Sequence, residues 1–189
     1  MRRSGLAYCA DVDPKRLDLL GQRGQLPFPK KLGNTYTVED AFRLRLMLDL
    51  IEEHGAHVEQ ARAVAVSGPD TLPHDPLSDP CGASAMWVGL VSATEPDDPL
   101  AKNRSCFCVG GQIEDLPRLA DERLRDMYAA YDLKTFIAVN ASRAAGFVLR
   151  RALEVGSSEA CAGALAGGMA RTNIKLPPLK CHTAKPGEP

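Results

Sequence analysis

Apolar residues recur at intervals of three and four over the first third of the chain, which is the spacing of helices with one buried side. The pattern predicts four helices, over residues 4–10, 14–21, 38–54 and 58–66. The connection between the first two is short, with Asp11 and Val12 at the turn. The chain is therefore expected to open with a helix, a tight turn and a second helix.

Two of these helices carry clear start signals. Asp13 is a good N-cap because its side chain can accept the first free amide hydrogens, and Pro14 suits the first helical position because it has no amide hydrogen. Thr37 and Asp40 have the spacing of a capping box, in which each side chain bonds the other residue's backbone amide. Gly55 is the expected end of the third helix.

The segment Leu26–Tyr36 predicts a hairpin with a basic tip. The two prolines of its outgoing arm cannot donate backbone hydrogen bonds, so this arm suits only the edge of a sheet. The tip contains the pair Lys30 and Lys31, followed by a turn at Gly33 and Asn34. A solvated surface turn is the plain interpretation of such a pair, and contact with a polyanion is the functional one.

The pattern changes after residue 66. Residues 67–82 contain four prolines, so a linker without regular structure is expected there. Beyond the linker, short apolar runs predict three strands, and longer amphipathic runs predict two helices. The strands are expected over residues 86–92, 105–109 and 135–139. The helices are expected over residues 113–131 and 141–155.

The net charge of −1 conceals an uneven distribution along the chain. Residues 1–36 carry seven Lys or Arg against three Asp, whereas residues 67–149 carry seven basic and twelve acidic groups. The segment from residue 150 onward is basic again. This division indicates different roles for the basic head and the acidic middle of the chain.

The order helix, turn, helix, basic hairpin, helix is that of a winged helix-turn-helix. In such domains the second helix enters the major groove of DNA with its N-terminal part, and the hairpin, or wing, reaches the flanking backbone. Lys15 and Arg16 lie on the first exposed turn of the expected second helix. Long cationic side chains at these places can neutralise phosphates. The basic tip is therefore expected to contact DNA.

Residues 4–66 resemble the DNA-binding domain of the MerR family and its phage-repressor and excisionase relatives. The resemblance rests on LAYCADVDPKRLDLLGQRGQLP, then the wing, then TYTVEDAFRLRLMLDLIEEHGAHVEQARA. It implies that the second helix and the wing supply the DNA contacts. The residues concerned are Lys15 and Arg16 in the helix, and Lys30, Lys31, Asn34 and Tyr36 in the wing. Tyr36 is equally well interpreted as a packing residue.

The chain departs from the family pattern in three ways, the first of which is that the wing arginine often found before the aromatic residue is missing, with Asn34 nearby instead. Asp18, Leu19 and Leu20 stand where family members carry an arginine and one or two tyrosines, and Asp18 would repel a phosphate. The proline-rich segment stands in place of the long coiled coil through which the family dimerises. A homodimer is therefore expected to form through the second domain, residues 83–155, or else through the head itself.

Other motifs with chemical potential are weaker. Cys106 and Cys108 would place two thiols on one face of a strand, but no further ligand follows at a recognised spacing, so buried thiols and no metal are expected. Asn140, Ser142 and Arg143 stand between a strand and a helix, where polar groups can line a pocket for a small-molecule effector. That effector has no other support in the sequence.

No catalytic signature is present, so neither an enzyme nor a cofactor is expected. Gly110 and Gly111 lie between a strand and a helix, but no GxGxxG pattern and no phosphate-binding lysine accompany them. No apolar run reaches the length of a membrane span, and the N-terminus lacks the apolar stretch of a signal peptide. Six cysteines without secretory signals then favour a cytoplasmic protein with reduced thiols.

The sequence thus predicts an α+β protein in which a winged helix-turn-helix is followed by a small mixed α/β domain. The expected parts are a DNA-binding domain (1–66), a linker (67–82), a domain for self-association or sensing (83–155) and a flexible tail (156–189). The expected function is a sequence-specific transcriptional regulator, a repressor, that binds double-stranded DNA. The alternatives are an architectural, excisionase-like protein that bends DNA, a protein-interaction adaptor on the same scaffold and, last, a small-molecule enzyme.

Overall fold

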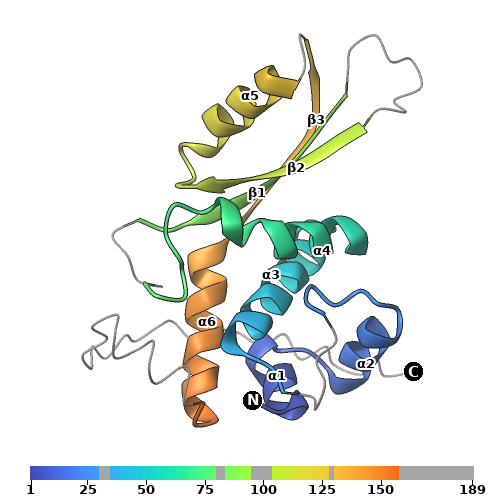
Figure 1. The fold of residues 1–189 in the computed structure, drawn as a ribbon, viewed down its shortest axis with the longest axis vertical. Helices are drawn as coiled ribbons and strands as arrows, with labels where there is room; N and C mark the ends of the chain where they lie inside the picture. Colours follow the sequence, from blue (N-terminus) through green and yellow to red (C-terminus); the bar gives the residue numbers. More distant parts are fainter. Residues whose placement is uncertain (30–34, 80–83, 95–103, 128–129, 158–189) are drawn as a thin grey trace, which may run out of the picture.

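The computed structural model describes residues 1–29, 35–79, 84–94, 104–127 and 130–157. Within these residues the fold is α+β, with six α-helices and a three-stranded antiparallel sheet (Figure 1). The helices are α1 (Arg3–Ala10), α2 (Pro14–Gln22), α3 (Val38–His54), α4 (Val58–Ser67), α5 (Leu116–Met127) and α6 (Ala141–Glu154), with a short 3-10 helix, η2 (Pro69–Thr71). The strands are β1 (Trp87–Thr94), β2 (Arg104–Gly111) and β3 (Asp132–Asn140).

The start signals of α2 and α3 are confirmed. The Asp13 carboxylate accepts hydrogen bonds from the amides of Lys15 at 2.7 Å and Arg16 at 3.4 Å. Thr37 and Asp40 form the predicted capping box, with the Asp40 amide 3.1 Å from Thr37 Oγ1 and the Thr37 amide 2.8 Å from Asp40 Oδ2. These bonds satisfy amides that a helix start otherwise leaves unpaired.

Three predicted segments differ from the structure. The helix predicted over residues 113–131 begins only at Leu116, because residues 112–115 form a turn in which the Asp115 amide bonds Gln112 O at 3.1 Å. The linker contains η2, which Thr71 stabilises through a hydroxyl bond to Gly68 O at 2.7 Å. The described parts of the predicted hairpin, 26–29 and 35–36, contain no strand, and the hairpin tip lies outside the described residues.

The sheet has the strand order β2-β1-β3, so β1 is central. Leu90 of β1 faces Cys108 of β2 on one side and Ile137 of β3 on the other. Every residue of β1 from Val88 to Thr94 is buried, which explains why its sequence is almost continuously apolar instead of alternating. Both faces of the sheet are covered by helices.

Each face of the sheet packs against a different hydrophobic core. The smaller core lies under α5 and includes Val91, Val109 and Leu124. The helices α1 to α4 form the helical head of the molecule. The larger core contains residues of this head, of the opposite face of the sheet and of α6, with Leu44 and Val88 among them. Residues from both sides of the predicted linker therefore share one core.

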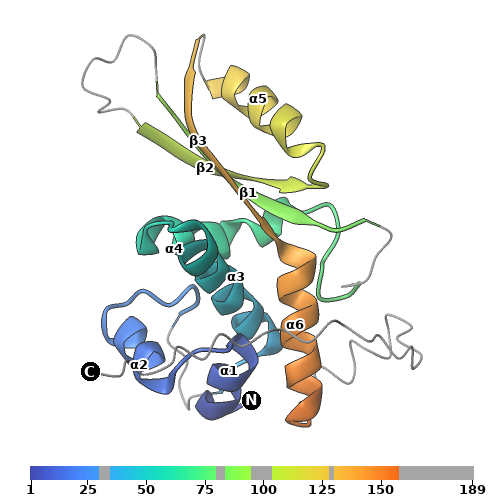
Figure 2. The same ribbon diagram turned by 180° about the vertical axis from the view of Figure 1, so that it is seen from behind.

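The helix α6 connects the two ends of the molecule. Figures 1 and 2 show α5 at one end, α1 and α2 at the other, and α6 running from the end of β3 to α1. Its buried residues recur at helical spacing and are mostly small, so α3 and α1 pack closely against it. They are Ala141, Ser142, Ala144, Ala145, Val148, Leu149 and Ala152.

None of the helices in the described part of the chain combines the length and the apolar composition needed to cross a membrane. The predicted tail, residues 156–189, lies outside the described residues from residue 158 onward.

Candidate nucleic-acid interface

The turn between α1 and α2 is short and well anchored. Asp11 caps the C-terminus of α1 with a φ of 56°, a conformation that aspartate tolerates better than most residues. Val12 is buried and donates its amide to Ala7 O at 3.0 Å. α2 begins at Pro14, so three residues separate the two helices. This is the connection length of helix-turn-helix motifs.

The helix α2 has one buried side and one solvent-facing side. Leu17 and Leu20 are buried against the head. Lys15, Leu19 and Gln22 are exposed, and their spacing of four and three residues places them on one face. The predicted contact residue Lys15 therefore lies on a free surface of α2.

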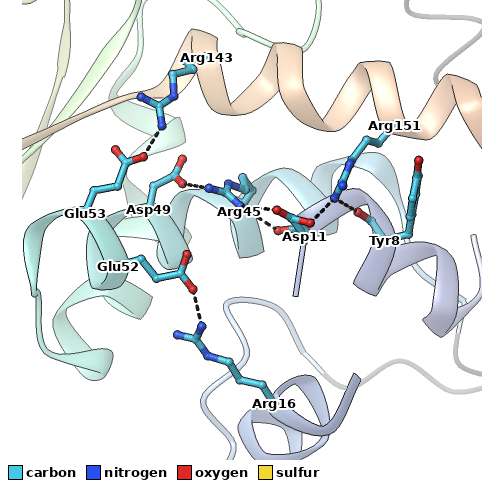
Figure 3. Close-up of polar contacts among 10 residues, drawn as sticks. Tyr8, Asp11, Arg16, Arg45, Asp49, Glu52, Glu53, Arg143 and Arg151 are labelled. Atoms are coloured by element: carbon cyan, nitrogen blue, oxygen red, sulfur yellow. Dashed lines mark hydrogen bonds and ion pairs between the residues drawn. The ribbon is translucent and has the colours of Figure 1, made fainter. Parts of the chain in front are cut away.

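The two charged residues beside this face are neutralised within the protein. Arg16 forms an ion pair with Glu52 of α3 (Figure 3), and Asp18 forms one with Arg3 of α1. Lys15 makes no such pair among the described residues. The repulsion that Asp18 would exert on a phosphate is therefore reduced, and Arg16 must exchange Glu52 for a phosphate before it can contact DNA.

The base of the predicted wing is held by the core, whereas its tip is not described. Lys30, Lys31 and Asn34 lie outside the described residues. On either side of the tip, the rings of Phe28 and Tyr36 are both buried and meet edge to face, with centroids 5.8 Å apart. Tyr36 is only 7% exposed, which favours its interpretation as a packing residue.

Hydrogen bonds to the backbone of Leu26 and Tyr36 also attach the base of the predicted wing to distant elements. The Tyr36 amide donates to Met1 O at 2.8 Å, and the Met1 ammonium donates to Tyr36 O at 2.5 Å. Arg62 of α4 donates its Nε to Leu26 O at 3.0 Å. The wing base is thus attached to the start of α1 on one side and to α4 on the other.

Asp11 is bound by arginines from two other helices (Figure 3). The Arg151 guanidinium of α6 lies 2.7 Å from Asp11 Oδ1, and Arg45 of α3 lies 3.8 Å from Asp11 Oδ2. Arg151 also donates to Tyr8 O at 2.7 Å and stacks over the Tyr8 ring at 4.6 Å. The turn between α1 and α2 is therefore connected directly to α6, which follows the sheet.

The contacts continue along α3. Arg45 lies 2.5 Å from the carboxylate of Asp49, which is 2% exposed. Burial raises the pKa of the Asp49 carboxyl, and the Arg45 guanidinium acts in the opposite direction. One turn further, Glu53 pairs with Arg143 at the start of α6. Ion pairs thus attach α6 to the end of α3 through Arg143 and to the turn between α1 and α2 through Arg151.

We expect Asp11→Ala to lower the free energy of unfolding by about 1–2 kcal/mol, because alanine is disfavoured at positive φ and binds neither arginine. Asparagine tolerates the same backbone conformation, so Asp11→Asn removes only the ion pairs. The Asp11 side chain is 54% exposed, so the free energy of unfolding should fall by less than about 1 kcal/mol in this variant. Urea denaturation followed by circular dichroism measures both. Equal losses would show that charge and not backbone conformation fixes the turn.

The other motifs have structural roles in the described residues. Ser142 Oγ accepts the Met86 amide at 2.9 Å, Asn140 caps α6 through the Arg143 amide at 2.8 Å, and Arg143 pairs with Glu53. These three residues therefore stabilise the junction of β3 and α6 and do not converge on a pocket for an effector.

Gly110 lies against Thr71, where a Cβ would come within 2.4 Å of the Thr71 hydroxyl. It serves close packing of β2 on η2.

Cys106 and Cys108 lie on the face of β2 that meets α4, and neither is in a disulfide. The prediction of two buried thiols is wrong, because Cys106 is exposed and Cys108 is half-buried at this edge strand. Cys108 Sγ lies 3.6 Å from Ser67 Oγ, and Cys106 Sγ lies 3.8 Å from Gln60 Nε2. Burial raises the pKa of the Cys108 thiol. Within the described residues no group of three or more His, Cys, Asp or Glu could hold a metal ion.

Comparisons of the chain with protein-family models, with curated proteins and with solved structures gave no match.

The sequence did not predict the structural roles of Asp11, Arg45 and Arg151. Arg45 and Asp49 are four residues apart on an otherwise apolar stretch of α3, which is a recognisable signal for a partly buried ion pair. The pairing of Asp11 with Arg151 spans 140 residues, and no local pattern indicates it.

Proposed function

We propose that the chain is a sequence-specific DNA-binding transcriptional regulator, a repressor, with a MerR-like winged helix-turn-helix in residues 1–66. The observation that carries the proposal is the free face of α2, which follows a three-residue turn and presents Lys15 without an ion pair among the described residues. In this proposal α2 enters the major groove of double-stranded DNA. Lys15 and Arg16 then contact DNA from the helix.

The wing supplies the remaining contacts in this proposal. Lys30, Lys31 and Asn34 bind phosphates that flank the groove, and buried Tyr36 holds the wing base in place. The anchoring of that base to Met1 and Arg62 supports the proposal, because a wing positions the protein only if its base is rigid. The protein would act in the cytoplasm, without a cofactor or metal.

We further propose that two copies pair through β3. Within the described residues β3 hydrogen-bonds with β1 on one side only, and Leu133 on this strand is 48% exposed. Two such edges can pair antiparallel about a two-fold axis, and a two-fold dimer matches operators with two symmetric half-sites. Binding two half-sites would raise affinity beyond what one short helix supplies.

The first step of the test selects duplexes from a randomised 20-base-pair library with the full chain. The affinity for the enriched duplex and for a shuffled duplex is then measured by fluorescence anisotropy over a salt series. Specific regulators bind their sites about 10³–10⁷-fold more tightly than other DNA, and their affinity falls steeply with salt. We expect one enriched motif, a clear preference over the shuffled duplex and two chains for each duplex. Failure to enrich any motif would contradict sequence-specific binding.

Two alternatives correspond to other outcomes of the same experiment. Equal, salt-dependent binding of both duplexes would favour an architectural protein that bends DNA. No binding to either duplex at low salt would favour the adaptor, which the internal pairing of Arg3 with Asp18 and of Arg16 with Glu52 supports, because it removes two cations from the head.

A further inference from the structure

We infer that Leu19 reads the methyl group of a thymine in the major groove, so that the preferred DNA contains a required thymine opposite α2. This inference rests on the proposed function and names the base chemistry at the same face. Leu19 is 44% exposed, although it lies one residue from Leu20, which is buried in the core. The helix therefore has an apolar side chain at the centre of its outward face.

The neighbours of Leu19 favour DNA as the occupant of this face. Lys15 precedes it by one turn, and Gln22 and Arg23 follow at three and four residues, so all four share one side of the helix. All four are exposed, and the two cations make no ion pair among the described residues. The one acidic side chain beside this face, Asp18, is bound by Arg3. A protein partner would instead be expected to meet a larger apolar patch.

The chemistry of the major groove assigns a specific partner to an apolar side chain. Thymine is the base that presents a methyl group there, and apolar side chains contact it, whereas the other edges present hydrogen-bond donors and acceptors. Leu19 can form no hydrogen bond, so a guanine or cytosine opposite it would gain nothing from the contact. A thymine would bury its methyl group against the Leu19 side chain.

The test replaces thymines with deoxyuridines, which lack only the methyl group. Each thymine of the enriched duplex is changed singly, and binding of the full chain is measured by anisotropy. We expect one thymine in each half-site at which the change weakens binding about fourfold, the factor for one buried methyl-sized group, ~0.8 kcal/mol. The Leu19→Ala variant should bind the thymine and uracil duplexes alike, whereas Leu19→Met should retain the difference.

A matched variant separates this effect from a general loss of affinity. Lys15→Ala should weaken binding to both duplexes equally and lower the salt slope by about one. Because Leu19 is exposed, the melting temperature of Leu19→Ala should equal that of the native chain, which excludes unfolding as the cause. If no thymine is sensitive, or if Leu19→Ala leaves the sensitivity intact, the inference is overturned while DNA binding stands. If no duplex is enriched, the proposed function falls with it.

Discussion

Replacing Gly68 with alanine is expected to lower the free energy of unfolding by about 3 kcal/mol. A Cβ on this residue would lie 2.5 Å from Val64 O and 2.5 Å from Val88 Cγ1. The first atom belongs to the backbone of α4 and the second to a fully buried residue of β1, so neither can move without shifting α4 or the sheet. Gly68 is thus the close contact between the helical head and the sheet.

The matched control is Gly21→Ala, the same substitution within α2. A Cβ there would meet only Leu26 Cδ1, at an ordinary 3.6 Å. Alanine is a better helix former than glycine, so this change should raise stability by about 0.5–1 kcal/mol. The two variants therefore make the same chemical change with opposite expected signs.

Urea denaturation with two probes measures the effect and also tests the shared core. Circular dichroism follows the helices, and Trp87, the single tryptophan, reports on β1. In Gly68→Ala both transitions should move together to lower urea, because the head and the sheet share buried residues. A shift of the tryptophan signal alone would contradict a single cooperative unit.

The features predicted correctly from the sequence are those that depend on a few neighbouring residues. The Asp13 cap, the box of Thr37 and Asp40 and the end of α3 at Gly55 are all satisfied by bonds within one or two turns. The strands around Val88 and Ile137 follow from short apolar runs for the same reason. Local chemistry of this kind is visible in any window of the sequence.

The arrangement of these elements could not be predicted in the same way. The small residues of α6, such as Ala144 and Ala145, fit against many surfaces, so their pattern does not say that α3 and α1 are the partners. The proline-rich segment predicts a linker, but glycine at position 68 allows that segment to pack directly on β1. Shared burial of distant residues is a property of the whole chain and has no local signature.

The same limit applies to the candidate interface. The spacing of Lys15 and Arg16 after Asp13 predicts two exposed cations, and the structure places both beside the free face of α2. It also pairs Arg16 with Glu52, which lies 36 residues away, so of these two cations Lys15 alone makes no ion pair within the described part of the chain. The exposure of Leu19, in contrast, agrees with helical spacing, because Leu19 lies two residues after the buried Leu17 and so on the opposite side of α2.

The largest effect on the proposed function is expected from the triple variant Lys15→Ala/Lys30→Ala/Lys31→Ala. In the proposal each lysine neutralises one phosphate, so removal of all three should weaken binding to the enriched duplex by about 100- to 1,000-fold and lower the salt slope by about 2–3. Sequence preference should change little, because phosphate contacts position the protein and do not read bases. Anisotropy over a salt series gives affinity and slope together.

The control removes three cations from the opposite end of the molecule, in Arg118→Ala/Arg123→Ala/Arg125→Ala. These arginines are exposed on α5, which lies at the other end of the molecule from α2 (Figure 1). Both triple variants lower the net charge by the same amount. If binding depended only on net charge, the two would lose affinity equally. We expect the α5 variant to bind as the native chain does, because α5 lies across the sheet from α2. Equal losses would contradict a localised interface, and no loss in the lysine variant would exclude the wing and α2 as the surface that binds DNA.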